Sequence, residues 1–181
     1  MKATGIVRRI DDLGRIVIPK EIRRTQRIHE GDPIEIYTSR DGEIMLKKYS
    51  PILEMGDFAN DYAESIAAVT RGLACVTDRE CVIAAAGPKK KDYAGKALSE
   101  ELENIMKMRT GIKRVEKGEE QIKLVPDDME NHKSQVIATI MSNGDCMGAV
   151  ILCADAEENT DMETAVKIVQ TAATFLGKQL L

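Results

Sequence analysis

Residues 4–18 read TGIVRRIDDLGRIVI, two runs rich in β-branched side chains on either side of a DDLG turn. β-branched residues favour extended backbone, and glycine accepts the positive φ that a tight turn requires. The pattern therefore predicts short strands over residues 4–10 and 15–18. Apolar side chains occur at successive positions, so both faces of each strand are apolar, which is typical of strands covered on two sides.

A short helix and a second hairpin follow. Pro19 is suited to open a helix, and we predict one over residues 19–28 with little apolar surface of its own. Residues 34–38 and 43–47 alternate around an Asp-Gly turn, which is a strong hairpin signal. A unit of about 50 residues buries little surface on folding. We therefore expect two copies of the chain to associate here, and the alternative is a monomeric subdomain that packs against the rest of the chain.

The sequence changes character after Pro51, which disfavours continuation of a strand. Apolar side chains recur at i, i+3 and i+4 from Met55 to Ala67, which predicts a helix that ends at Gly72. The further predicted elements are strands over residues 73–77 and 81–86, a helix over about 93–108, a weak strand near 121–125, strands over 134–142 and 146–154, and a last helix opened by a capping box at 160–163. This order indicates an α+β domain with an antiparallel sheet.

We expect an N-terminal domain over residues 1–50, a linker over 51–55 and the α+β domain over 56–181.

Charge is distributed unevenly along the chain. The chain carries 26 basic and 30 acidic side chains, a formal net charge of −4. Residues 1–27 hold eight basic and three acidic side chains, a net charge of +5, so the other 154 residues carry −9. A basic segment on an acidic body points to a polyanionic partner.

Several protein classes are disfavoured. The longest apolar stretches, residues 136–141 and 146–154, are shorter than the ~18 residues of a membrane span, and the N-terminus shows no signal-peptide pattern, so we expect a cytoplasmic protein without a membrane partner. The cysteines show no Cys-x-x-Cys spacing, so we expect buried free thiols rather than a metal site or disulfides. No G-x-S-x-G, H-E-x-x-H or P-loop motif occurs, which disfavours an enzyme with catalytic residues. The cysteines are Cys75, Cys81, Cys146 and Cys153.

Five arginines dominate the basic segment. Arg8 and Arg9 end the first predicted strand, Arg15 begins the second, and Arg23 and Arg24 lie on the short helix. A guanidinium group suits bidentate contact with phosphate or with guanine, although a solvated charge run is the common alternative. The segment contains no Trp or Phe, and its tyrosines lie outside the arginine cluster. Duplex DNA is therefore favoured over single strands recognised by base stacking.

The residues of this region resemble the AbrB family of bacterial transition-state regulators throughout 4–49. The matching segments are TGIVR (4–8), LGRIVIP (13–19), IRRT (22–25), GD (31–32) and LKKY (46–49). The resemblance implies a swapped-hairpin β-barrel in which two chains form one dimer that binds double-stranded DNA. The family's DNA-contacting residues correspond to Arg8, Arg15, Arg23 and Arg24, with Arg9 and Lys20 as flanking phosphate contacts. One departure is Gln26-Arg27, where the family often has Leu-Gly, and we expect it to alter the helix end rather than the arginine surface.

Residues 56–181 have the element order of a GAF domain, without a sharp signature motif. An AbrB-like head joined to a GAF-like domain resembles family members that regulate late gene expression in the developing spore. A GAF fold implies a pocket for a small-molecule effector of unknown identity, and the loop at residues 87–92 is either a cap for an anionic ligand or a solvated loop. A domain that only joins dimers into a homotetramer through its terminal helices is equally open.

The leading prediction is a sequence-selective, double-stranded DNA-binding transcriptional regulator, activator or repressor, of late sporulation genes. It is expected in the cytoplasm of the developing spore, associated with the nucleoid. Specificity would combine arginine contacts with DNA deformation, and no cofactor is expected beyond the possible effector. The alternative from another class is an antitoxin that neutralises a toxin partner through its C-terminal region, because the same swapped-hairpin head occurs in such proteins.

Overall fold

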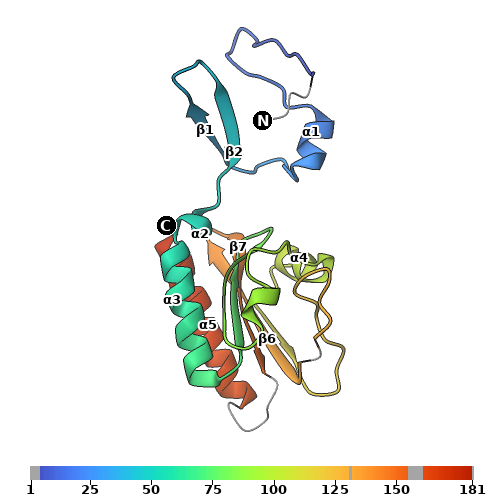
Figure 1. The fold of residues 1–181 in the computed structure, drawn as a ribbon, viewed down its shortest axis with the longest axis vertical. Helices are drawn as coiled ribbons and strands as arrows, with labels where there is room; N and C mark the ends of the chain where they lie inside the picture. The colour runs from blue at the N-terminus through green and yellow to red at the C-terminus, as the bar shows by residue number, and fades with distance from the viewer. Residues whose placement is uncertain (1–4, 131, 155–160, 181) are drawn as a thin grey trace. The chain divides into compact units, whose positions relative to one another are not determined.

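The structure, a computed structural model, describes residues 5–130, 132–154 and 161–180 (Figure 1). It divides into two compact units, an N-terminal unit, Met1–Tyr49, and a C-terminal unit, Ser50–Leu181. In the N-terminal unit, helix α1 (Lys20–Thr25) follows Pro19, and strands β1 (Ile34–Thr38) and β2 (Ile44–Lys48) form an antiparallel hairpin. The predicted helix and second hairpin are thus confirmed, and the helix is shorter than the expected residues 19–28.

The two strands predicted over residues 4–10 and 15–18 are not formed, because residues 5–10 and 15–18 lie in no strand of the described chain. The turn between them is closed by hydrogen bonds from Gly14 N to Asp11 O and from Asp11 N to Arg15 O, each 3.0 Å. Val7 remains 85% exposed. An extended segment becomes a strand only when a neighbour takes its backbone hydrogen bonds. The described part of a single chain supplies no such neighbour here.

The C-terminal unit is built on a five-stranded antiparallel sheet with the strand order β4-β3-β7-β6-β5. Its strands are β3 (Leu73–Thr77), β4 (Val82–Ala86), β5 (Ile112–Val115), β6 (Ser134–Ser142) and β7 (Asp145–Ala154). Its helices are α2 (Pro51–Glu54), α3 (Gly56–Thr70), the 3₁₀ helix η1 (Lys90–Asp92), α4 (Glu100–Lys107) and α5 (Met162–Gln179). The antiparallel α+β fold predicted from the order of elements is confirmed.

Both faces of this sheet are covered. Helices α3 and α5 pack on one face, where Val150 and Leu152 of β7 belong to their core, and α4 with its flanking loops packs on the other, where Ile151 and Cys153 point (Figure 1). Because successive side chains of a strand alternate between faces, two-sided coverage explains why β7 is apolar throughout its buried length. None of the helices in the described ranges is long and apolar enough to cross a membrane.

Two predicted elements of the C-terminal unit differ from the structure, one in its first residue and one in its existence. The helix expected over 93–108 begins only at Glu100, because Ser99 caps it by accepting a hydrogen bond from Leu102 N (3.1 Å). The preceding residues instead hydrogen bond to the edge of β4, where Gly95 N donates to Val82 O (2.9 Å). The strand expected near 121–125 is absent, and β5 takes the edge position instead.

Side chains from other segments hold residues 121–125 in place of a strand neighbour. Gln135 accepts from Ile122 N and donates to Ile122 O, both at 2.8 Å, and Asp128 accepts from Leu124 N at 3.0 Å. Fixed side-chain partners satisfy these backbone groups without a ladder. At α5, Asp161 caps the helix by accepting from Thr164 N (2.9 Å), whereas Thr160 of the predicted capping box lies outside the described residues.

The segment predicted as a linker, residues 51–55, contains α2. Ser50 caps this helix and donates a hydrogen bond to Asp78 Oδ2 in the β3–β4 turn (2.9 Å), and Ile52 is buried in the core under α3 and α5. Ile52 Cδ1 lies beside Gly148 of β7, where a Cβ atom would stand 2.8 Å from it and 1.9 Å from Thr77 O. The chain therefore enters the C-terminal unit through an anchored turn of helix.

The four cysteines are free thiols, of which Cys75 and Cys153 are buried and Cys81 and Cys146 are half-buried. Burial raises the pKa of Cys75 to about 12. Burial, together with the neighbouring Asp78, raises the pKa of Cys81 to about 11. These thiols are therefore protonated and poorly nucleophilic at neutral pH.

Replacement of Gly148 by alanine is expected to destabilise the C-terminal unit by about 3 kcal/mol, because the added Cβ collides with the backbone of β3 and cannot be accommodated by a side-chain rotation. Urea denaturation followed by circular dichroism measures the loss. Gly56→Ala is the matched control, since no atom lies within 4 Å of its Cβ position and its stability should be unchanged or higher by up to about 1 kcal/mol. Equal stability of the two variants would contradict this close strand contact.

Candidate nucleic-acid interface

Arg15 is held on an exposed turn by a single carboxylate. Asp11 Oδ1 accepts hydrogen bonds from Leu13 N (3.0 Å) and Arg15 N (2.8 Å), and Asp11 Oδ2 accepts from Arg15 Nε (2.8 Å). The hydrogen bonds from the Arg15 backbone and side chain lower the pKa of Asp11 below its ordinary value. Because this ion pair is exposed, it contributes little to stability and acts to orient the guanidinium.

A second cationic group lies on α1. Arg23 and Arg24 stand in its last turn, three and four residues after Lys20, so all three share one side of the helix. No residue of α1 is buried. In the described chain this helix therefore contributes surface rather than core, and that surface is basic.

Arg8 and Arg9 form a third group, on the segment at residues 5–10, which lies in no strand. Both are exposed, and Arg8 Nη1 donates only to the neighbouring Val7 O at 3.3 Å. Among the described residues no hydrogen bond or ion pair joins the groups on the segment, the turn and the helix to one another. A single chain therefore presents the predicted arginines as three separate groups.

Two residues that sequence reasoning left without a role fix the end of α1. Asp32 accepts a hydrogen bond from His29 N (2.8 Å) and pairs with Lys48 Nζ (3.1 Å), and Lys48 Nζ also donates to Arg27 O (2.8 Å). Burial acts to raise the pKa of Asp32, but the His29 amide and the Lys48 ammonium outweigh it and lower the pKa. This connection joins α1 to β2. Both residues lie in segments that resemble the AbrB family, GD (31–32) and LKKY (46–49). This resemblance is the feature of the sequence that could have identified them.

The helix end differs from the expectation for Gln26-Arg27. Ile28 N donates to Arg23 O (2.7 Å) and Arg27 N donates to Arg24 O (3.3 Å), the two bonds of a Schellman motif. Arg27 takes φ +50° at the position where such motifs favour glycine. The helix therefore ends normally despite the arginine, and the expectation that this departure alters the helix end is wrong.

The N-terminal unit also exposes much apolar surface. The exposed apolar side chains are Ile6, Val7, Ile10, Leu13, Ile16, Val17, Ile36, Tyr37, Ile44, Met45, Leu46 and Tyr49. Most of them lie on the two segments predicted as strands and on the hairpin β1–β2. So many exposed apolar side chains on so small a unit are typical of a surface that a partner covers.

In the C-terminal unit, a buried polar cluster joins two loops. Tyr93 Oη donates to Asp128 Oδ1 (2.9 Å) and lies 3.2 Å from His132 Nε2.

In the loop predicted as an anion cap, Lys89 pairs with Glu130. That ion pair neutralises one of the three lysines of the loop and leaves Lys90 and Lys91 exposed on η1. Within the described ranges no cluster of His, Cys, Asp and Glu is suited to hold a metal ion.

Comparison with known proteins agrees with both units. The family model described as "Stage V sporulation protein T C-terminal, transcription factor" matches residues 54–181, and one described as "Antidote-toxin recognition MazE, bacterial antitoxin" matches residues 7–54. Stage V sporulation protein T of Bacillus subtilis (strain 168) is 49% identical over 180 residues, which cover 99% of each chain. Transition state regulatory protein AbrB of the same organism is 61% identical over 51 residues, 28% of this chain and 52% of that protein.

Solved structures support the fold of the C-terminal unit alone. The GAF domain of an Acinetobacter phosphoenolpyruvate-protein phosphotransferase is similar with a TM-score of 0.56 and 12% identity, over 74% of this chain and 84% of that one. The cofactor-binding GAF domain of the nutrient sensor CodY from Clostridium difficile is similar with a TM-score of 0.53 and 16% identity, over 74% and 99%. An AbrB-like DNA-binding head is thus followed by a GAF fold in a DNA-binding transcriptional regulator. The chain belongs to the stage V sporulation protein T family.

Proposed function

We propose that the chain regulates late sporulation genes by binding double-stranded DNA through the arginine groups of its N-terminal unit. The contacts are Arg8, Arg15, Arg23 and Arg24, with Arg9 and Lys20 as flanking phosphate contacts. The observation that carries this proposal is α1, a helix without a buried residue whose one side is basic and whose end is fixed by Asp32 and Lys48. Arginine on a fixed, exposed helix suits bidentate contact with phosphate and base edges.

Two copies of the chain are needed to complete this surface. Residues 5–10 and 15–18 lie in no strand and are rich in exposed apolar side chains, and a second copy that inserts its own segments would pair them as strands and cover those side chains. Such an exchange is the swapped hairpin implied by the AbrB resemblance. It would also bring Arg8 and Arg9 of one copy onto a rigid sheet, and would present two sets of arginines related by a twofold axis.

Arg15→Ala and Arg23→Ala are each expected to weaken binding of duplex DNA strongly while the protein stays folded. Each lost phosphate contact should also reduce the magnitude of the slope of log K against log salt by about 0.9. Gel-shift titrations over a salt series measure both effects. Arg40→Ala is the control, because Arg40 is an exposed arginine in the β1–β2 turn of the same unit and removes the same charge. Affinity that falls equally in all three variants would mean that net charge, and not these positions, governs binding.

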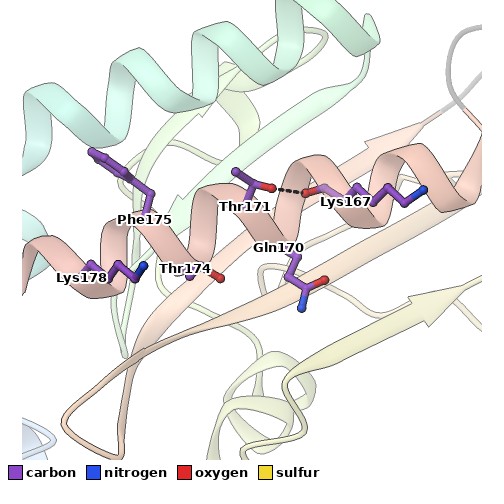
Figure 2. A pocket seen from close by; sticks show the side chains of 6 residues that line it. All are labelled: Lys167, Gln170, Thr171, Thr174, Phe175 and Lys178. Carbon is purple, nitrogen blue, oxygen red and sulfur yellow. Dashed lines mark hydrogen bonds between the residues drawn. The ribbon is translucent and has the colours of Figure 1, made fainter.

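We further propose that the C-terminal unit joins two such dimers into a homotetramer through α3 and α5. A groove of about 390 Å³ runs between these helices and is lined by Tyr62, Ile66, Val69, Ile168 and Ala172 among others. Figure 2 shows side chains of α5, where the Phe175 ring is directed toward α3 and Lys167 and Lys178 lie along the helix. The rings of Phe175 and Tyr62 have centroids 5.2 Å apart.

Charge complementarity favours a second copy as the occupant of this groove. Helix α3 carries three exposed acids, Asp57, Asp61 and Glu64, whereas α5 carries exposed Lys167 and Lys178 with one exposed acid, Glu163, which pairs with Lys167 (2.7 Å), so the two helices still have opposite net charge. A twofold axis across the helix layer places α3 of one copy against α5 of the other, so that opposite charges meet around an apolar centre. Signal sensing by a small-molecule effector in the GAF fold is the alternative use of this unit.

Val69→Glu is expected to convert tetramers into dimers, because Val69 is 72% exposed on the described chain and would bring a charge into the apolar centre of the interface. Native mass spectrometry of the full chain gives the subunit number. Met129→Glu is the control, since Met129 is 91% exposed and lies outside the helix layer. A tetramer that survives Val69→Glu, or a monomeric wild type, would refute this assembly.

An antitoxin is the second candidate, favoured by the MazE family model over residues 7–54. Against it stands the C-terminal region, which would have to hold the toxin but folds as a domain whose own family model is described as a transcription factor. Copurification of a small toxin with the full chain would support the antitoxin, and DNA recovered without such a partner would support the regulator.

A further inference from the structure

We propose that Asp11 is a positioning residue that directs Arg15 to base edges rather than to backbone phosphate. This inference rests on the proposed DNA-binding surface and gives one of its arginines a distinct task. The starting observation is that the two oxygens of the Asp11 carboxylate have different partners. Oδ1 accepts hydrogen bonds from Leu13 N (3.0 Å) and Arg15 N (2.8 Å), whereas Oδ2 accepts from Arg15 Nε (2.8 Å).

The turn that carries Arg15 does not need the second oxygen. Its backbone is closed by the hydrogen bonds from Gly14 N to Asp11 O and from Asp11 N to Arg15 O, and the two amides bonded to Oδ1 complete it. All these contacts lie within residues 11–15, so they form in a single chain and do not depend on a second copy. The bond from Arg15 Nε to Oδ2 therefore orients the guanidinium without building the turn.

This ion pair decides which donors of Arg15 remain for DNA. A guanidinium group has five N–H donors, and Asp11 occupies the one on Nε. The other four lie on the two terminal nitrogens, and within the described chain they have no hydrogen-bond partner outside residue 15. The two terminal nitrogens together match the O6 and N7 acceptors of guanine. The Arg15 side chain is 69% exposed, which leaves room for such a contact.

The same carboxylate disfavours a phosphate at this position. The hydrogen bonds from Arg15 hold the pKa of Asp11 below its ordinary value, so the carboxylate is ionised at neutral pH. A phosphate that approaches the guanidinium also approaches this second anion and is repelled by it. The base acceptors carry only partial charge and are repelled less. An arginine that is already oriented also loses less side-chain entropy on binding. Asp11 therefore acts on the preference among sequences more than on the total affinity.

Asp11→Asn separates the roles of the two oxygens. The Asn carbonyl can replace Oδ1 in the turn, whereas the NH₂ group at the place of Oδ2 cannot accept from Arg15 Nε. In the full chain, the preference for a duplex enriched from a random pool by the wild type, over a scrambled duplex of equal composition, should fall about fivefold for each copy in contact with DNA. Fluorescence anisotropy at fixed salt measures both affinities. The melting temperature from circular dichroism should be nearly unchanged, because an exposed ion pair stabilises little.

Asp12→Asn is the matched control. Asp12 is an exposed acid of the same turn, and within the described chain it has no hydrogen-bond or ion-pair partner. This variant removes the same charge, so it should bind both duplexes slightly more tightly and keep the wild-type preference. A preference in Asp11→Asn equal to that in Asp12→Asn would overturn the role of Asp11.

Two variants of Arg15 complete the test. Arg15→Lys keeps the charge without the planar fork, so it should lose the preference while it retains most of the affinity for the scrambled duplex. Retention of the preference in Arg15→Lys would overturn the contact to a base, even if Asp11→Asn failed to fold. Arg15→Ala tests the surface itself. If it binds both duplexes as the wild type does, the surface and this inference fail together, and if it is weakened while Asp11→Asn matches its control, only this inference fails.

Discussion

The missing strand pairing of residues 5–10 and 15–18 is the constraint on which the N-terminal unit depends. These segments combine a β-branched, apolar sequence with exposure in the single chain, and the turn between them is closed by its own hydrogen bonds. Exposed edges of this kind are templates for another strand. The same segments carry Arg8, Arg9 and Arg15, so whatever supplies the missing strands also sets the positions of these arginines. In this unit, association of two chains would therefore also position the arginines that are proposed to contact DNA.

Helix α1 is positioned by a different device, which works within one chain. Its side chains contribute nothing buried, so packing alone cannot hold a six-residue helix. The connection from Asp32 through Lys48 to the carbonyl of Arg27 replaces packing with a partly buried charged contact and ties the helix to the hairpin β1–β2. The hairpin is held by the antiparallel pairing of β1 with β2, and a few polar atoms link the arginine-bearing helix to it.

Local sequence patterns were sufficient wherever local interactions decide the structure. The hairpin β1–β2, the long pair β6–β7 and the helices α3 and α5 follow from alternation, turn residues and helical spacing. The strand predicted near residues 121–125 is absent because the side chains of Gln135 and Asp128 hold the backbone there by hydrogen bonds. Gln135 is remote in sequence, and Asp128 lies at an irregular spacing. The strands predicted at residues 4–10 and 15–18 are not formed in the described single chain because it supplies no neighbouring strand. At the candidate site, the arginines were recognisable from their motif, but the roles of Asp32 and Lys48 depend on a contact across 16 residues.

The charge of the C-terminal unit indicates how this unit can contribute to DNA affinity. Residues 50–181 hold 15 basic and 22 acidic side chains, a net charge of −7. DNA repels such a surface, so the unit adds little to DNA affinity by direct contact. It can still raise affinity by linking heads, because a second head on the same assembly binds at a high effective concentration. That gain needs no new protein–DNA contacts, and in the proposed tetramer it would be lost when the interface through α3 and α5 opens. A signal that acts on this interface would therefore control DNA occupancy without reaching the arginines.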